Sequence, residues 1–154
     1  MTPIGHFILR QSLSLLGPDG QLAAFKMDLD DFRVVNNSLG HASGDDALRL
    51  YCSIVKKVLG RAGEVYRRGG DEVVAFAPGL EATVAQTLAE EVRAGIESEF
   101  RDWSVQRGLT SFPTASIGLV LTNGSRSFDE IVLLMDNAQH EAKQQGKNRV
   151  VCRR

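Results

Sequence analysis

Two clusters of acidic residues each stand where a predicted strand meets a turn. Asp28-Leu29-Asp30 follows the apolar run Leu22–Met27, and Asp71-Glu72 directly follows Gly69-Gly70. If the first strand pairs beside the second segment, Asp28 and Asp71 converge at one edge of the sheet. Carboxylates crowded there repel each other, which raises a pKa or recruits a cation. Because Mg²⁺ prefers oxygen ligands, usually one or two carboxylates with substrate phosphates, the pair indicates metal-assisted phosphoryl or nucleotidyl transfer.

Each candidate residue also has an ordinary structural explanation. Acidic pairs are common at solvated sheet edges, and the local pattern alone supports that explanation as well as it supports a metal site. Most Gly-Gly pairs simply form hairpin turns. Asp45 taken alone is a first-turn helix acid, and Lys143 and Lys147 taken alone are solvated lysines near a helix end. Asn36 taken alone is a surface or turn residue.

Hydrophobic periodicity predicts the elements that position the acidic clusters. An amphipathic helix over His6–Leu16 ends at the turn residues 17–20, and the buried strand Leu22–Met27 follows. Strands at 64–68 and 71–77 are joined by Gly69-Gly70, which is typical of a tight β-hairpin. Between these strands, one helix runs from near Phe32 to Gly40, and a second opens at Ser43 with an apolar face of Leu48, Tyr51, Val55, Val58 and Leu59.

The second half of the chain alternates helices and strands. Thr114–Thr122 is a predicted strand that follows Pro113, residues 128–145 form a helix, and residues 148–152 form a last strand. This order predicts an α/β sandwich with a mainly antiparallel sheet. Two helices present apolar stripes that we expect to face inward: Val84, Leu88, Val92, Ile96 and Phe100 in the first, and Ile131, Met135, Ala138 and Ala142 in the second.

The bulk composition excludes several classes of protein. With 154 residues, 43% hydrophobic and 24% charged, the chain has the size and balance of one globular domain. A net charge of −1 gives it no general electrostatic hold on nucleic acid or on an anionic membrane. The longest apolar runs are too short to span a bilayer, and the N-terminus lacks a secretory signal pattern. Cys52 and Cys152 are expected to be two buried thiols in a reducing cytoplasm.

Four ordered blocks carry a resemblance to a known family. Residues 25–45 read FKMDLDDFRVVNNSLGHASGD, residues 67–76 read RRGGDEVVAF, residues 114–119 read TASIGL, and residues 136–150 read DNAQHEAKQQGKNRV. In this order and spacing they resemble the GGDEF family of diguanylate cyclases, from about Leu22 to Val150. The resemblance implies a palm-like α+β fold, related to nucleotidyl cyclases and ferredoxin-like domains, with a sheet of about five strands flanked by helices.

The resemblance also implies roles for individual residues. Asp28, Asp71 and Glu72 match the catalytic acids, and Asp28, the Leu29 carbonyl, Asp71 and Glu72 match the ligands of Mg²⁺, for which Mn²⁺ is the alternative ion. Glu72 would either polarise the attacking 3′-hydroxyl or hold a second metal ion. The positions matched to substrate binding are Asn36 and Asp45 for guanine, Gly69 and Gly70 for close approach of the backbone, and Arg33, Lys143 and Lys147 for the phosphates.

The implied activity is the condensation of two GTP molecules into cyclic di-GMP and two pyrophosphates, by two-metal nucleotidyl transfer across a transient homodimer. The implied regulatory partner is a sensory domain, either fused or interacting. A catalytically idle domain that binds GTP or docks a partner protein is the first alternative, and an enzyme that uses ATP is the second. Asp45 argues against ATP, because a carboxylate accepts from the N1–H and N2–H₂ edge of guanine, which adenine lacks.

Two departures from the family pattern affect regulation and domain extent. The family's product-inhibition motif, Arg-x-x-Asp, is replaced in register by Gly60 and Gly63, and Arg61–Glu64 is an Arg-x-x-Glu shifted by one residue. We therefore expect feedback binding to be absent or weak. The segment Thr2–His6 only loosely resembles the family's opening segment, so residues 1–154 are expected to form one GGDEF domain with a truncated or diverged N-terminus.

Overall fold

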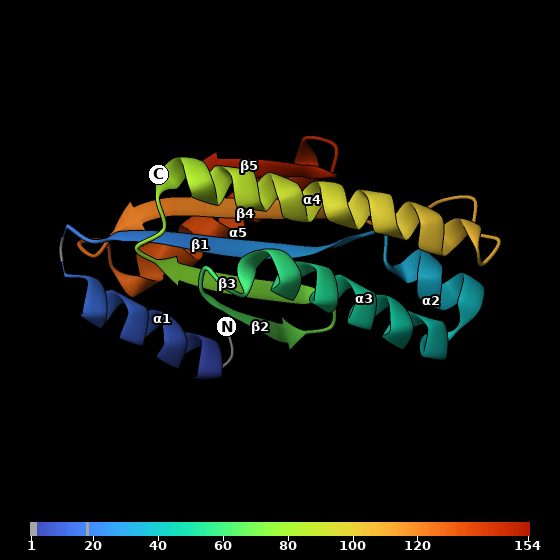
Figure 1. Ribbon diagram of the computed structural model, residues 1–154, viewed down its shortest axis with the longest axis horizontal. Helices are drawn as coiled ribbons and strands as arrows, with labels where there is room; N and C mark the ends of the chain where they lie inside the picture. Colours follow the sequence, from blue (N-terminus) through green and yellow to red (C-terminus); the bar gives the residue numbers. More distant parts are fainter. Residues whose placement is uncertain (1–2, 18) are drawn as a thin grey trace.

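The computed structural model describes residues 3–17 and 19–154 of the chain. Within these residues, helices and strands follow one another in the predicted order (Figure 1). The turn at 17–20 and the segment Thr2–His6 fall partly outside the described residues. The elements are α1 (Pro3–Leu16), β1 (Gln21–Asp30), α2 (Arg33–Leu39), α3 (His41–Leu59), β2 (Glu64–Gly69), β3 (Glu72–Pro78), α4 (Ala82–Val105), β4 (Thr114–Asn123), α5 (Phe128–Gln144) and β5 (Arg149–Arg153).

The strands form one mixed sheet in the order β2-β3-β1-β4-β5. β1 lies at its centre and pairs antiparallel with both β3 and β4, whereas β4 and β5 pair in parallel. The sheet is therefore mainly antiparallel, which confirms the predicted α+β architecture. The end of β1, the β2–β3 turn and α2 all lie toward the same end of the sheet (Figure 1). The two acidic clusters, Asp28–Asp30 and Asp71-Glu72, therefore lie at the same end of the sheet.

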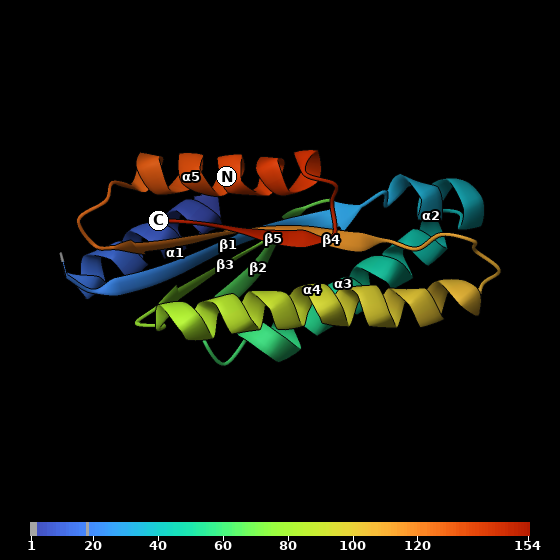
Figure 2. The same cartoon turned by 90° about the horizontal axis from the view of Figure 1, so that it is seen from above.

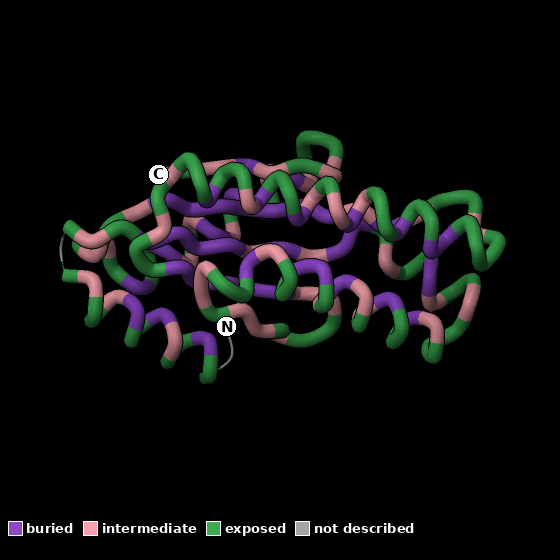
Figure 3. Tube along the Cα trace, in the orientation of Figure 1, coloured by how far each residue is buried: buried purple, intermediate pink, exposed green. Residues whose placement is uncertain are grey.

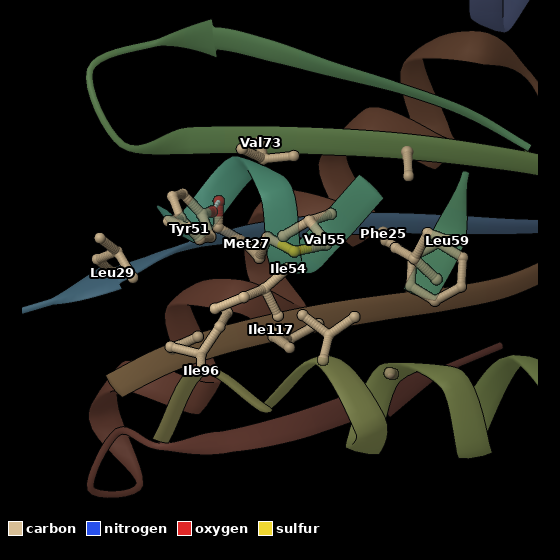
Figure 4. Packing of buried hydrophobic residues seen from close by; sticks show 14 of the residues in the cluster. Phe25, Met27, Leu29, Tyr51, Ile54, Val55, Leu59, Val73, Ile96 and Ile117 are labelled. Atoms are coloured by element: carbon tan, nitrogen blue, oxygen red, sulfur yellow. Dashed lines mark hydrogen bonds between the residues drawn. The ribbon is translucent and has the colours of Figure 1, made fainter. Parts of the chain in front are cut away.

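Helices cover both faces of the sheet (Figure 2). α3 and α4 pack on one face, over a core that includes Phe25, Tyr51 and Ile96 (Figure 4). α1 and α5 pack on the other face, over a second core that includes Leu9 and Phe76. The central strands are buried along most of their length (Figure 3), which is why they read in the sequence as short apolar runs rather than as alternating ones. No helix in the described part of the chain is long and apolar enough to cross a membrane.

The inward face of α4 differs from the predicted one in its first half. Val84 is 43% exposed, whereas Ala85 and Ala89 are fully buried. α4 packs against β4 and β5, and small side chains such as alanine on the inward face allow a helix to lie close to a sheet. From Val92 onward the predicted stripe of Val92, Ile96 and Phe100 is buried. In α5, all four predicted inward residues are buried.

Three further expectations are corrected by the structure. β1 does not end at Met27 but continues to Asp30, because β4 keeps pairing with it through Asp28↔Ser116 and Asp30↔Thr114. α3 begins at His41, two residues before the predicted Ser43. Cys52 and Cys152 are free thiols as expected, but both are half-buried rather than buried, and Cys52 lines an open surface depression.

Candidate active site

β1 and α5 face each other with matching polar side chains. Lys26, Asp28 and Asp30 lie on one face of β1, because alternate strand residues share a face. On α5, residues spaced three and four apart face them, since such residues lie on one side of a helix. The resulting contacts are Lys26 with Asp136 at 2.7 Å, Asp28 with Gln139 at 2.8 Å and Lys143 at 2.7 Å, and Asp30 with Lys143 at 3.4 Å. This polar seam fixes the acidic end of β1 against α5.

Asp28 is a half-buried carboxylate whose charge is unfavourable where it lies. Burial raises its pKa from 3.8 to about 6, and repulsion from Asp71 and Asp30 adds to that rise. The Lys143 ammonium opposes the rise through its hydrogen bond and its charge. Burial lowers the pKa of Lys143, but its contacts with Asp28 and Asp30 outweigh this effect and raise it. A further positive charge near Asp28 would therefore stabilise its ionised form, which Lys143 alone does not fully stabilise.

Asp30 is a buried structural brace. Only 1% of the residue is exposed, and its carboxylate accepts hydrogen bonds from Thr114 Oγ1 at 2.7 Å, Ser116 Oγ at 2.5 Å and the backbone N–H of Asn148 at 3.0 Å. A buried carboxylate needs such partners, because an unpaired charge in the interior is costly. Asp30 thereby joins β1, β4 and the start of β5. It holds in place the strand that carries Asp28.

Asp71 lies in the β2–β3 turn, which approaches the end of β1. Gly69 and Gly70 both have positive φ, at 136° and 53°, values that residues with a Cβ rarely adopt. Burial raises the pKa of Asp71, while hydrogen bonding from its own backbone and from that of Leu29 lowers it. The charges of Asp28 and Asp71 are close enough to repel each other. The two predicted acids therefore meet, as the sequence pattern indicated.

Glu72 begins β3 and faces two cations. Its Oε1 lies 3.0 Å from Lys26 Nζ, and its Oε2 lies 3.4 Å from Arg68 Nε. A hydrogen bond links the neighbouring strand β1 to α3: the buried Tyr51 hydroxyl donates to the Met27 carbonyl at 3.1 Å (Figure 4). Glu72 thus stands on a well-packed strand pair, with both carboxylate oxygens paired.

An open depression of about 650 Å³ lies beside these acids. Asp71, Asn36 and Arg33 line it, together with Asp31, Phe32, Val34 and Asn37. The Asn36 Oδ1 atom lies against Gly44, where an added Cβ would overlap it. Asp45 is exposed and lines a separate depression of about 200 Å³ with Leu48, Arg49, Cys52 and Arg67. The structure therefore places Arg33, Asn36 and Asp71 together, and places Asp45 apart from that lining.

Lys147 lies at the rim and contacts a different acid from Lys143. Its Nζ is 2.8 Å from Asp31 Oδ1, and both residues have positive φ, at 66° and 59°. Asn148 also has positive φ, at 47°, and its side chain contacts Arg93 and Glu97 of α4. Left-handed backbone at residues other than glycine costs free energy, and it clusters at functional sites. The ion pair closes the loop after α5 onto the loop after β1.

The donor atoms present suit a divalent cation that is shared with a substrate. Among residues 3–17 and 19–154, no group of three or more His, Cys, Asp and Glu side chains is arranged to hold a metal ion. Asp28 and Asp71 nevertheless offer only oxygen donors beside the Leu29 backbone, and their mutual repulsion favours a cation. Mg²⁺ commonly takes one or two carboxylates and completes its shell with phosphate oxygens and water. The residues therefore fit such an ion.

Lys26, Asp136 and Gln139 are the site residues that sequence reasoning missed. Lys26 is a single charge inside an apolar strand run, and it shares a strand face with Asp28. Asp136 and Gln139 precede Lys143 by seven and four residues, which places all three on one helix face. The spacing along the strand and the spacing along the helix each indicate a shared face. Neither spacing shows that the strand face and the helix face contact each other.

Comparisons with known proteins show the family of this chain. The family profile for "Diguanylate cyclase, GGDEF domain" matches residues 8–149. The probable diguanylate cyclase DgcT of Escherichia coli K12 is 34% identical over 82% of this chain and 28% of its own length. Diguanylate cyclase DgcM of the same strain is 32% identical over 96% of this chain and 32% of its own length. The chain thus spans about a third of these relatives.

Solved structures show the same fold. The GGDEF domain of DgcB from Caulobacter crescentus in complex with c-di-GMP has a TM-score of 0.82 at 24% identity, over 97% of this chain and 87% of that one. The active GGEEF domain of a diguanylate cyclase from Vibrio cholerae has a TM-score of 0.74 at 23% identity, over 97% and 90%. With a profile match over most of its length and this shared fold, the chain belongs to the GGDEF domain family of diguanylate cyclases.

Proposed function

We propose that this chain condenses two GTP molecules into cyclic di-GMP. The observation that supports it most is the meeting of Asp28 and Asp71, two half-buried carboxylates with raised pKa values, beside an open depression lined by Asn36 and Arg33. Such a pair is suited to a divalent cation and to the negative charge of a triphosphate that accompanies it. The curated relatives, which are named as diguanylate cyclases, support the same reaction.

The chemistry is two reciprocal nucleotidyl transfers. The 3′-hydroxyl oxygen of each GTP attacks the α-phosphorus of the other, and a phosphodiester bond forms as the bond to the bridging oxygen breaks. Two pyrophosphates leave, and each attacking hydroxyl loses its proton. Asp28, the Leu29 carbonyl and Asp71 would hold a divalent ion, which would neutralise charge and activate the hydroxyl in this class of reaction. Glu72 faces the attacking hydroxyl in this proposal.

In this proposal, residues on the helices around the acids, and Lys147 in the loop after α5, bind the GTP molecule. Asn36 and Asp45 bind the guanine edge, and Arg33, Lys143 and Lys147 bind phosphate oxygens. Asp45 lines a separate depression from Asn36, so in this proposal its exposed side chain turns toward Asn36 when guanine binds. Gly69 and Gly70 allow the turn backbone to approach the nucleotide, since no Cβ intrudes.

Each chain holds one GTP, so two chains meet face to face for the reaction. This makes the rate depend on dimer geometry, because positioning supplies much of the catalysis in such transfers. The relatives are about three times as long as this chain. We infer that residues 1–154 act as one GGDEF domain, and that a sensory domain supplies the dimerisation signal.

The direct test is product analysis. Incubation with GTP and Mg²⁺, followed by chromatography, should yield cyclic di-GMP from the wild type and none from Asp71→Ala or Glu72→Ala. Binding of GTP without any product, in a well-folded protein at high concentration, would instead favour an idle GTP-binding domain.

A further inference from the structure

Lys26 is a charged residue inside the central strand. Its neighbours Phe25 and Met27 are fully buried, and its own side chain is only 13% exposed. Burying an ammonium group is costly unless it is paired. Its partners are Asp136 Oδ1 at 2.7 Å on α5 and Glu72 Oε1 at 3.0 Å on β3. A lysine in this position therefore connects a helix to the acid next to the turn.

The acids and bases that interact with one another around Asp28 and Glu72 carry an excess of negative charge. The connected groups comprise the carboxylates Asp28, Asp30, Asp71, Glu72 and Asp136, and the cations Lys26, Arg68 and Lys143. Five negative and three positive charges leave a deficit of two. One Mg²⁺ beside Asp28 and Asp71 would balance that deficit. A second divalent ion at Glu72 would face Lys26 and Arg68, which already contact both carboxylate oxygens.

We propose that Lys26 is a positioning residue for Glu72: anchored by Asp136, its ammonium group orients the Glu72 carboxylate and supplies the positive charge that a second metal ion would provide there. The inference rests on the proposed function, since it gives Glu72 a role in GTP turnover. It goes further in assigning the cation at Glu72 to the protein itself. Arg68, at 3.4 Å from the other oxygen, completes the pairing.

Replacing Lys26 by methionine removes the ammonium and keeps an unbranched apolar side chain in the strand. Glu72 then retains Arg68 as its cationic partner, and the excess of negative charge around the site grows by one unit. Charge-assisted hydrogen bonds of this kind correspond to about a tenfold to hundredfold effect. We expect Lys26→Met to lower kcat by about that factor at low Mg²⁺, with KM for GTP nearly unchanged, and to recover part of the loss at high Mg²⁺.

The experiment combines turnover with a count of bound metal. Mn²⁺ binding is followed by electron paramagnetic resonance in the presence of a GTP analogue that cannot react. Lys26→Met should bind one more Mn²⁺ per chain than the wild type, whereas Lys26→Arg, which keeps the charge, should not. Lys57→Met is the matched control, because Lys57 is an exposed lysine in the last turn of α3.

The outcomes separate this inference from the proposed function. Lys26→Met with the Mn²⁺ count and Mg²⁺ dependence of Lys57→Met would overturn the role of Lys26. A wild type that yields no cyclic di-GMP would refute the proposed function, while the Mn²⁺ count still tests the cation at Glu72. Should Lys26→Met not fold, Asp136→Asn releases the anchor and keeps the ammonium. It should raise the Mg²⁺ requirement in the same direction, and an unchanged requirement would contradict the proposal.

Discussion

Lys143 Nζ lies 2.7 Å from Asp28 Oδ1, and yet the pKa of that carboxyl is raised to about 6. Burial outweighs the nearby ammonium, and Asp71 and Asp30 add repulsion. The site is therefore assembled with negative charge that the protein alone does not fully compensate. A bound cation would relieve that repulsion, which couples the stability of this region to ligand binding.

The pH dependence of folding should show the cost of ionising Asp28. Because its pKa is higher in the folded state than in the unfolded state, its contribution to stability is fully present below pH 3.8 and is lost as the pH rises through about 6. In Asp28→Asn this loss is absent. The free energy of unfolding of the variant relative to the wild type should therefore increase by about 2 to 3 kcal/mol between pH 4 and pH 7.

Urea denaturation at several pH values measures this difference. Glu91→Gln, which changes an exposed acid on α4, serves as the control and should show no such trend. A constant difference between Asp28→Asn and the wild type across this range would mean that Asp28 ionises without penalty.

Base selection should depend on Asp45. Asp45→Ala removes the acceptor for the guanine edge, so GTP affinity should fall by about tenfold to a hundredfold while ATP affinity stays the same. The matched control is Asp46→Ala, which removes an adjacent exposed acid that pairs with Arg49 at 2.9 Å. Competitive binding of GTP and ATP checks the prediction. Equal effects of the two substitutions would point to net charge rather than to base recognition.

The space at Gly44 should matter through Asn36. In Gly44→Ala the added methyl group overlaps Asn36 Oδ1 and forces that side chain to move. Alanine is the better helix former by about 1 kcal/mol, so helix propensity itself does not weaken α3. We expect GTP affinity to fall by about tenfold, in proportion to one lost hydrogen bond.

Gly95→Ala in α4 is the matched control, since its added methyl group meets only Ile54 Cγ2 at 3.3 Å. Calorimetric titration with a GTP analogue measures both variants. If Gly44→Ala binds the analogue as tightly as Gly95→Ala does, Asn36 does not contribute to guanine binding.

The brace at Asp30 should stabilise the whole fold. Ser116→Ala removes the donor at 2.5 Å from a carboxylate that is 1% exposed, so the free energy of unfolding should fall by about 1.5 to 3 kcal/mol. Ser53→Ala removes an exposed hydroxyl on α3 that donates to the Leu50 carbonyl at 2.7 Å, and should change this free energy little. Similar denaturation midpoints for the two variants would show that Asp30 does not depend on this bond.

Much of the fold could be predicted from the sequence, because its strands and helices carry strong local signals. The apolar runs of β1 and β4 and the period of α5 mark elements that tertiary packing reinforces. The inward face of α4 could not be predicted this way. Val84 is more hydrophobic than Ala85, but close approach of the helix to β4 and β5 favours the smaller side chain. The hydrophobicity of neighbouring residues does not indicate how close a helix lies to the sheet.

The site was predictable where residues cluster in sequence and unpredictable where the contacts are long-range. Asp28 and Asp71 meet as the turn pattern indicated. Lys26 and Asp136 are 110 residues apart in the sequence, and their side chains meet because α5 packs on the face of the sheet that contains β1. The position of Asp45 outside the depression lined by Asn36 depends on side-chain orientation, which spacing along α3 does not determine.

The most direct test of the account is GTP turnover per chain as a function of protein concentration, with Mg²⁺ present and cyclic di-GMP quantified. The proposed reaction needs two chains, each holding one GTP, so specific activity should rise with concentration below the dimerisation constant and should vanish in Asp71→Ala. Specific activity that is independent of concentration, or that persists in Asp71→Ala, would contradict the proposed mechanism.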